Sequence, residues 1–158
     1  MTAPAPAPPR ADRIRAIVAA HAGDRAPLLV ILHAVQHEYG YVDPEVVPVL
    51  ADALNLSVAE VHGVISFYSD FRTTPPGRAQ VRICRGEACQ AVGAAGLVEY
   101  ARTRLGIDVG ATTPDGAVSL DEVFCLGNCA LGPAVQVDGR LHGRVGPARL
   151  DALLGDLP

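Results

Sequence analysis

The chain contains 158 residues, of which 49% are hydrophobic, and this is ample for one or two small cores. It carries 13 basic and 17 acidic residues, a formal net charge of −4, and every basic residue is an arginine. No basic stripe favours nucleic acid, and no apolar run approaches the ~18 residues that a membrane-spanning helix needs. We therefore expect a soluble protein with neither direct membrane insertion nor nucleic-acid binding.

The first half of the chain has the apolar spacing of helices. Residues 1–9 consist mostly of Ala and Pro, and we expect them to form an extended, disordered tail. Apolar residues at helical spacing then predict one helix from Asp12 and a second from Pro27, ended by Gly40.

Two further helices are expected before the composition changes. Asp43-Pro44 can cap a third helix that ends near Leu54, with a kink or a late start caused by Pro48. Ser57-Val58-Ala59-Glu60 forms a capping box, which predicts a short fourth helix. Together these predict a helical domain over residues 10–77, closed by Pro75-Pro76-Gly77.

The remaining residues, 78–158, alternate strand and helix patterns. Residues 80–83 alternate like a strand and lead into Cys84, and a helix is expected to open at Cys89 and run to about Leu105. Strand-like residues 117–124 lead into Cys125 in the same way. Each expected strand therefore ends at a cysteine.

A hairpin and a last helix complete this second domain. We expect Val135 and Val137 to pair across Asp138-Gly139 with Leu141 and Val145, and Pro147 to start the final helix. The periodicity alone predicts an α/β domain with one small sheet.

All four cysteines fall in two short loops. Four residues separate Cys84 from Cys89, 35 separate Cys89 from Cys125, and three separate Cys125 from Cys129. Each loop supplies two thiols and a glycine that lets backbone N–H groups approach sulfur. This pattern predicts one metal centre.

The spacing leaves more than one kind of site open. A structural zinc ion also takes four thiolates, although its loops usually hold two residues between cysteines. A thiol–disulfide active site prefers two residues between its cysteines. Structural disulfides need an oxidising compartment, and the N-terminal residues do not resemble a signal peptide that would direct the chain to one. The spacing modestly favours a [2Fe–2S] cluster over zinc and ranks disulfides last.

Further motifs resemble a known family. The two cysteine loops, Gly132-Pro133 and the segment Gly63–Tyr68 are similar to the thioredoxin-like [2Fe–2S] subunit shared by respiratory complex I, NAD-linked hydrogenases and NAD-dependent formate dehydrogenases. Within this family, residues 85–90, Phe71-Arg72 and residues 141–145 most resemble the gamma subunit of the molybdenum formate dehydrogenases.

The resemblance implies a thioredoxin-like fold for residues 78–158 and one [2Fe–2S] cluster, with Cys84, Cys89, Cys125 and Cys129 as its ligands. It implies a cytoplasmic electron-transfer subunit without an active site of its own. The subunit is expected to lie next to a flavin subunit that binds FMN and NAD, with a molybdenum cofactor on a larger subunit. A complex I or hydrogenase subunit is the alternative parent, and a zinc-stabilised interaction module or a thiol-redox protein is the alternative class.

Three residues are expected to surround the cluster. Four thiolates, two sulfides and two ferric ions sum to about −2, and one added electron makes −3, so nearby N–H groups and cations must moderate the charge. Gly86 and Gly127 are expected to let the backbone approach the cluster. Arg85 is a candidate for tuning the cluster, although an ordinary solvated arginine is the simpler interpretation and the one we favour.

Overall fold

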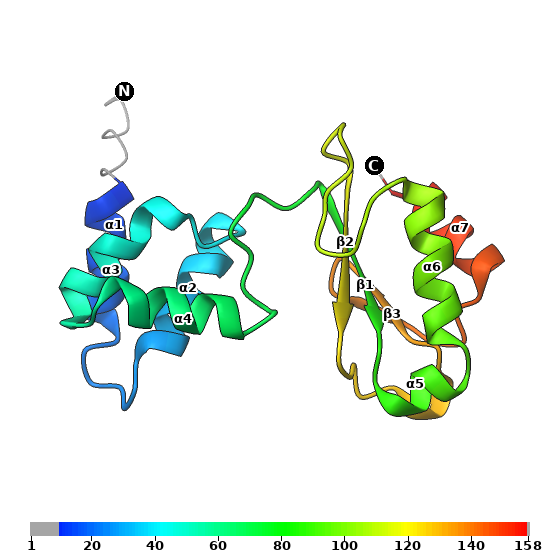
Figure 1. The fold of residues 1–158 in the computed structure, drawn as a ribbon, viewed down its shortest axis with the longest axis horizontal. Coiled ribbons are helices and arrows are strands. Elements are labelled where there is room, and N and C mark those ends of the chain that lie inside the picture. Colours follow the sequence, from blue (N-terminus) through cyan, green and yellow to red (C-terminus); the bar gives the residue numbers. More distant parts are fainter. Residues whose placement is uncertain (1–9, 158) are drawn as a thin grey trace, which may run out of the picture. The chain divides into compact units, whose positions relative to one another are not determined.

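A computed structural model describes residues 10–157 of the chain, so the tail predicted at residues 1–9 lies outside the described residues. The chain divides into two compact units, with the division between Pro75 and Pro76 (Figure 1). None of the helices within residues 10–157 is long and apolar enough to cross a membrane.

The first unit is helical, and local signals in the sequence define its elements. Gly40 ends the second helix with a φ of 80°, and Ser57 and Glu60 cap each other at the start of the fourth. The third helix starts late, because a 3₁₀ turn capped by Asp43 precedes it and Pro48 lies in its first turn. The elements are α1 (Arg10–Ala20), α2 (Leu28–Tyr39), η1 (Pro44–Val46), α3 (Val47–Leu54) and α4 (Val58–Phe67).

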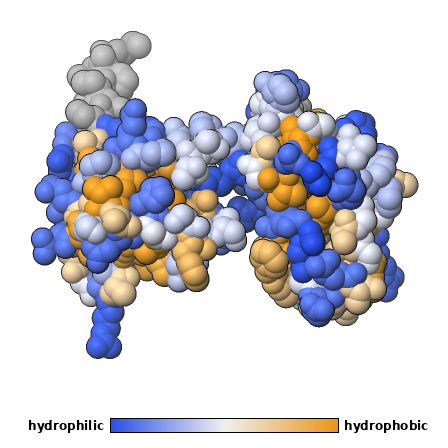
Figure 2. All heavy atoms as spheres, in the orientation of Figure 1, coloured by the Kyte–Doolittle hydropathy of each residue, from blue (hydrophilic) through white to orange (hydrophobic). Residues whose placement is uncertain are grey.

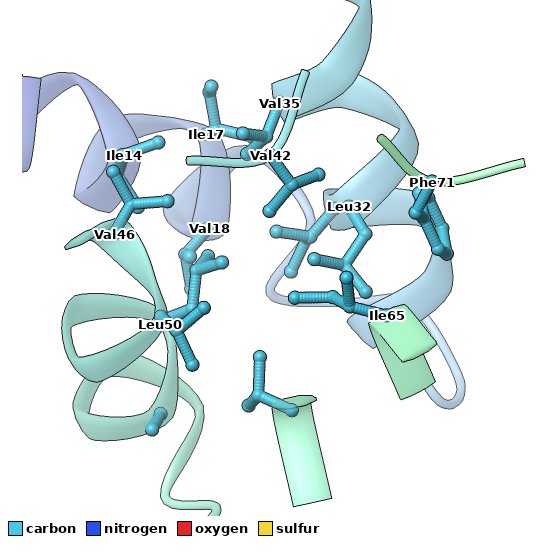
Figure 3. Close-up of a cluster of buried hydrophobic side chains, with 14 residues drawn as sticks. Ile14, Ile17, Val18, Leu32, Val35, Val42, Val46, Leu50, Ile65 and Phe71 are labelled. Atoms are coloured by element: carbon cyan, nitrogen blue, oxygen red, sulfur yellow. The ribbon is translucent and has the colours of Figure 1, made fainter. Parts of the chain in front are cut away.

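One hydrophobic core holds the helical unit together. Aliphatic side chains from all four α-helices point toward one another, and Phe71 closes one side of the core after the last helix (Figure 3). The Gln36 side chain holds the segment around Phe71 against α2. It donates to the Asp70 carbonyl at 2.6 Å and accepts from the Arg72 N–H at 2.7 Å. The largest fully buried members are Ile14, Ile31, Leu32, Val35, Val42, Leu50 and Val61.

The second unit is built on a four-stranded sheet of order β2-β1-β3-β4. β1 and β2 are parallel, whereas β3 is antiparallel to both β1 and β4. The predicted mixed α/β class is therefore confirmed. The elements are β1 (Ala79–Cys84), α5 (Glu87–Ala91), α6 (Ala94–Leu105), β2 (Val118–Val123), η2 (Cys129–Leu131), β3 (Val135–Val137), β4 (Arg140–His142) and α7 (Pro147–Gly155).

Two local predictions for this unit are wrong. The single helix expected from Cys89 to Leu105 is two helices, because the chain turns at Gly93, whose φ of 97° ends α5 and precedes α6. The hairpin is shorter than expected, since Leu141 lies opposite Gln136 and the two-residue turn fixes that register. Val145 lies beyond the strand, fully buried, and its N–H donates to the Pro133 carbonyl at 3.0 Å.

The sheet and its helices bury a second, separate core. A hydrogen bond of 2.5 Å from Tyr100 to Asp151 joins α6 to α7 at the edge of this core. The fully buried members include Val81, Ile83, Ala101, Val135, Val145 and Leu150. Figure 2 shows that hydrophobic surface also reaches the outside of each unit, between hydrophilic patches.

An irregular segment follows the outer edge of β2. Gly110 N–H donates to the Leu120 carbonyl at 2.7 Å, Leu120 N–H donates to the Ala111 carbonyl at 3.0 Å, and Thr113 N–H donates to the Val118 carbonyl at 2.8 Å. The backbone of β2 from Val118 to Leu120 is therefore hydrogen-bonded on both sides, to this segment and to β1.

Gly77 packs tightly against β2, which gives a stability prediction. A Cβ atom at this position would lie 2.9 Å from the backbone of both Val118 and Ser119, and the Gly77 N–H donates to Ser119 Oγ at 2.7 Å. We expect Gly77→Ala to lower the free energy of unfolding by about 1–3 kcal/mol, as overpacking does. Urea unfolding measures this.

Gly96→Ala is the matched control. Nothing lies within 4 Å of a Cβ at this position in α6, so the substitution should raise stability by about 0.5–1 kcal/mol, as an alanine in a helix does. Equal effects of the two substitutions would contradict the packing described for Gly77.

Candidate metal centre

The parallel pairing of β1 and β2 brings the two cysteine loops to one edge of the sheet. Cys84, the last residue of β1, lies opposite Val123, the last residue of β2. The Arg85 N–H donates to the Val123 carbonyl at 2.8 Å and extends this pairing by one residue. Because parallel strands end at the same edge, the loop leading to α5 and the loop after β2 lie together (Figure 1).

The four thiols differ in exposure. Cys84 and Cys89 are buried, whereas Cys125 and Cys129 are exposed, and all four are free thiols. Ala94, the first residue of α6, and Ala134, just before β3, pack against the buried pair. The site therefore has a protein-facing side and a solvent-facing side.

The thiols lie close enough to change one another's acidity. Burial raises the pKa of the Cys89 thiol, and the neighbouring Cys84 and Cys129 raise it further. Contact with Cys125 raises the pKa of the Cys129 thiol, with burial and Cys84 adding to the effect. Crowded thiols resist carrying negative charge together, so a positive metal centre must displace their protons when it binds.

Two glycines lie within contact distance of the thiols. A Cβ on Gly86 would lie 3.5 Å from Cys84 Sγ and 3.6 Å from the Cys125 Cβ, so this glycine lies between the two loops. A Cβ on Gly132 would lie 3.3 Å from Cys89 Sγ and 2.9 Å from a methyl group of Val92. The structure thus places Gly86 beside the thiols, and it adds Gly132, which the sequence did not single out as a neighbour of sulfur.

The second loop has an unusual backbone. Cys125 has a φ of 146°, which residues with a side chain rarely adopt, and Gly127 has a φ of 72°. This turn directs the Gly127 N–H at Cys125 Sγ, 3.3 Å away. The Gly127 N–H therefore donates to sulfur, and backbone strain of this kind is often found at functional sites.

Arg85 is held in an ion pair that the sequence did not reveal. Its Nη1 contacts Glu122 Oε1 on β2, and the two side chains are 27% and 22% exposed. The Arg85 Nε is buried and has no acceptor among the described residues. Arg85, which follows Cys84 in the sequence, is thus held by Glu122 and is not the freely solvated arginine of the simpler interpretation.

The four thiols are the donors that a [2Fe–2S] cluster takes. Such a cluster is held by four cysteine thiolates, two on each iron, which matches two loops with two cysteines each. Within residues 10–157, no group of three or more Cys, His, Asp or Glu side chains is drawn together around a single metal position. The Gly127 N–H on sulfur and the space left by Gly86 fit a [2Fe–2S] cluster as well.

Large exposed apolar side chains lie near the cysteines. Phe124, adjacent to Cys125, is 71% exposed, and Leu131, two residues after Cys129, is 41% exposed. Val92, beside Gly132, is also exposed. We call Phe124, Leu131 and Val92 the apolar rim; apolar groups gathered at one edge of a site are typical of a protein interface.

The fold and this set of thiols are those of an iron–sulfur electron-transfer protein. More specifically, the chain belongs to the thioredoxin-like [2Fe-2S] ferredoxin family, whose model matches residues 14–158. The family resemblance and the thioredoxin-like fold class predicted from the sequence are confirmed. One [2Fe–2S] cluster is accordingly its cofactor.

Two curated relatives align with most of the chain. The chain is 38% identical over 129 residues to the NADP-reducing hydrogenase subunit HndA of Solidesulfovibrio fructosivorans, and the alignment covers 82% of this chain and 75% of that relative. It is 36% identical over 143 residues to a subunit of the NADH-quinone oxidoreductase of Rhizobium meliloti, covering 90% of this chain and 85% of that relative.

A solved structure has a similar fold. The crystal structure of an NAD⁺-reducing [NiFe]-hydrogenase in the air-oxidized state contains a chain that matches with a TM-score of 0.66 and 29% identity. The match covers 82% of this chain and 22% of that one, so the present chain corresponds to less than a quarter of the hydrogenase chain.

Substitution of a buried thiol tests the ligand set. We expect Cys84→Ser to abolish the visible absorption of the iron–sulfur cluster, since a hydroxyl is a much poorer iron ligand than a thiolate. The helical unit has its own core and should keep its far-UV circular dichroism. Ala88→Ser, in the same loop, is the control and should retain both signals. A Cys84→Ser protein with the full spectrum would exclude Cys84 as a ligand.

Proposed function

We propose that the chain is the electron-transfer subunit of an NAD-dependent formate dehydrogenase and that Cys84, Cys89, Cys125 and Cys129 hold its [2Fe–2S] cluster. The observation that carries the proposal is the meeting of two cysteine pairs at one edge of the sheet, next to exposed apolar side chains. The bound cluster would accept and return one electron at a time. Its neighbour in the complex would be a subunit that binds FMN and NAD.

The residues of this chain have separate tasks in that role. Regular elements position three of the four thiols: Cys84 ends β1, Cys89 lies in α5 and Cys129 begins η2. Burial of Cys84 and Cys89 keeps water from one side of the cluster, while Cys125 and Cys129 lie toward the surface where a partner can approach. The Gly127 N–H, 3.3 Å from Cys125 Sγ, favours negative charge on that sulfur.

The names of the relatives support an NAD-linked parent complex. Two of them are a subunit of an NADP-reducing hydrogenase and a subunit of an NADH-quinone oxidoreductase, and the solved structure is an NAD⁺-reducing hydrogenase. We infer from this that the partner of the chain exchanges electrons with a pyridine nucleotide. The reducing cytoplasm, which preserves free thiols, is the compartment we propose.

Formate dehydrogenase is the proposed parent because of three sequence segments. Residues 85–90, Phe71-Arg72 and residues 141–145 resemble the gamma subunit of the molybdenum enzymes. A hydrogenase or complex I is the alternative, supported by the similarity to subunits of both. In a hydrogenase the complex would contain nickel and no molybdenum cofactor. In complex I it would contain quinone-linked membrane subunits.

Purification of the native complex separates these parents. We expect a tag on this chain to recover a flavin subunit and a molybdenum subunit, with formate-dependent NAD⁺ reduction in the eluate. Metal analysis and mass spectrometry measure the outcome. Recovery of nickel, or of membrane subunits without molybdenum, would reject formate dehydrogenase in favour of the alternative parent.

Spectroscopy of the chain tests the cofactor itself. We expect anaerobically purified protein to be red-brown, to bleach with dithionite, and to gain a rhombic EPR signal of about one spin per chain. A colourless protein that contains one zinc ion would instead establish the zinc-stabilised interaction module.

The apolar rim gives a prediction about assembly. We expect Phe124→Ser to weaken association with the flavin subunit by about tenfold or more, because truncation of a large aromatic at an interface removes much of its binding energy. Co-purification yield at several salt concentrations measures this. Val58→Ser, at an exposed valine of the helical unit, should leave the yield unchanged. An unchanged yield for both variants would place the interface elsewhere.

A further inference from the structure

Arg85 and Glu122 form an ion pair at the cysteine edge of the sheet, and they come from different strands. Arg85 directly follows Cys84, and Glu122 lies on β2, three residues before Cys125. The register places Glu122 opposite Ile83, one residue before Cys84. The two charges therefore lie where both cysteine loops leave the sheet.

The Arg85–Glu122 pair is expected to contribute little to folding stability. Ion pairs near the surface usually do so, because solvent screens them and ordering two side chains costs entropy. These two side chains are less than a third exposed, so their charges act on nearby groups with less screening than those of a fully solvated pair. The buried Arg85 Nε also has no acceptor among residues 10–157, which leaves a donor at the end of β1 that protein groups do not satisfy.

We propose that Arg85 and Glu122 act in opposite directions on the reduction potential of the [2Fe–2S] cluster, with Arg85 raising the potential and Glu122 lowering it, so that their effects largely cancel in the intact pair. The inference rests on the proposed cluster site. Reduction transfers one electron from a reductant, dithionite in the experiment below, to the cluster, and no bond forms or breaks. The added negative charge is favoured by the arginine and opposed by the carboxylate, so removal of either charge alone shifts the potential.

The pair makes the potential adjustable by small changes. Whichever of the two charges lies nearer to the added electron dominates, and Glu122 also holds the Arg85 side chain in place. Loss of Arg85 leaves an uncompensated carboxylate beside the cluster, whereas loss of the Glu122 charge leaves an uncompensated guanidinium. A purely structural pair would respond alike to both losses, because either one breaks the same contact. An electrostatic pair responds with opposite signs.

Potentiometric titration of Arg85→Gln and Glu122→Gln, followed by absorption and EPR, tests this. A unit charge acting over about 10 Å through an effective dielectric of about 20 changes an equilibrium by on the order of tenfold. At a fixed potential we therefore expect the ratio of reduced to oxidised protein to fall about tenfold in Arg85→Gln and to rise about tenfold in Glu122→Gln. For one electron, tenfold corresponds to about 59 mV.

Two further variants complete the experiment. The double substitution should return the ratio to within about threefold of the original protein, since it removes both charges together. Arg102→Gln removes an arginine that pairs with Asp108 at the other end of α6 from Ala94, and it should leave the ratio unchanged. Higher salt should reduce the two single shifts, because it screens charges.

Each outcome is decisive. Shifts of the same sign, or shifts below twofold in both single variants, overturn the inference while the cluster spectrum of the original protein still supports the proposed function. If Arg85→Gln does not retain a cluster, Glu122→Gln decides alone, and a ratio that does not rise overturns the inference. An original protein without any cluster would reject the proposed function and this inference together.

Discussion

The site depends on the parallel register of β1 and β2. Because Cys84 and Val123 are paired as the last residues of their strands, two loops separated by 35 residues of sequence begin at the same height on the same edge. A slip by two residues would move one cysteine pair about 7 Å along the sheet and separate it from the other. Gly77 and Ser119 reinforce the register at the opposite end of the strands, where the glycine fits directly against the β2 backbone.

The sequence predicted those parts of the fold that short-range chemistry determines. Ser57 and Glu60 cap each other through groups three residues apart, and Gly40 ends its helix through its own backbone freedom. Both helix ends could therefore be predicted from the sequence. The interruption at Gly93 was not predicted, because apolar residues continue at helical spacing on both sides of it. Val145 was predicted to lie in a strand for a similar reason. A buried valine after a turn has the same place in the apolar pattern whether or not its backbone pairs with the strand across the turn.

The candidate site was predicted in its composition and only partly in its arrangement. Four cysteines, two glycines and the family resemblance sufficed for the kind of cofactor. The difference in exposure between the two cysteine pairs needs the positions of Ala94 and Ala134, and no spacing rule contains these. Likewise, the partner of Arg85 is 37 residues away in sequence, and only the strand register identifies it as Glu122. Pairings across strands are tertiary information.

The segment from Gly110 to Thr113 has a consequence for how this protein meets others. An unpaired edge strand invites a strand from another chain, and such pairing recognises the backbone with little regard to sequence. Here the N–H and carbonyl groups on the outer side of β2 are occupied by the protein's own loop at Val118 and Leu120, in the first half of the strand. Sheet extension along that half of β2 is thus blocked. A partner that approaches there has to be recognised through the identity and shape of side chains, and not through a backbone that every protein shares.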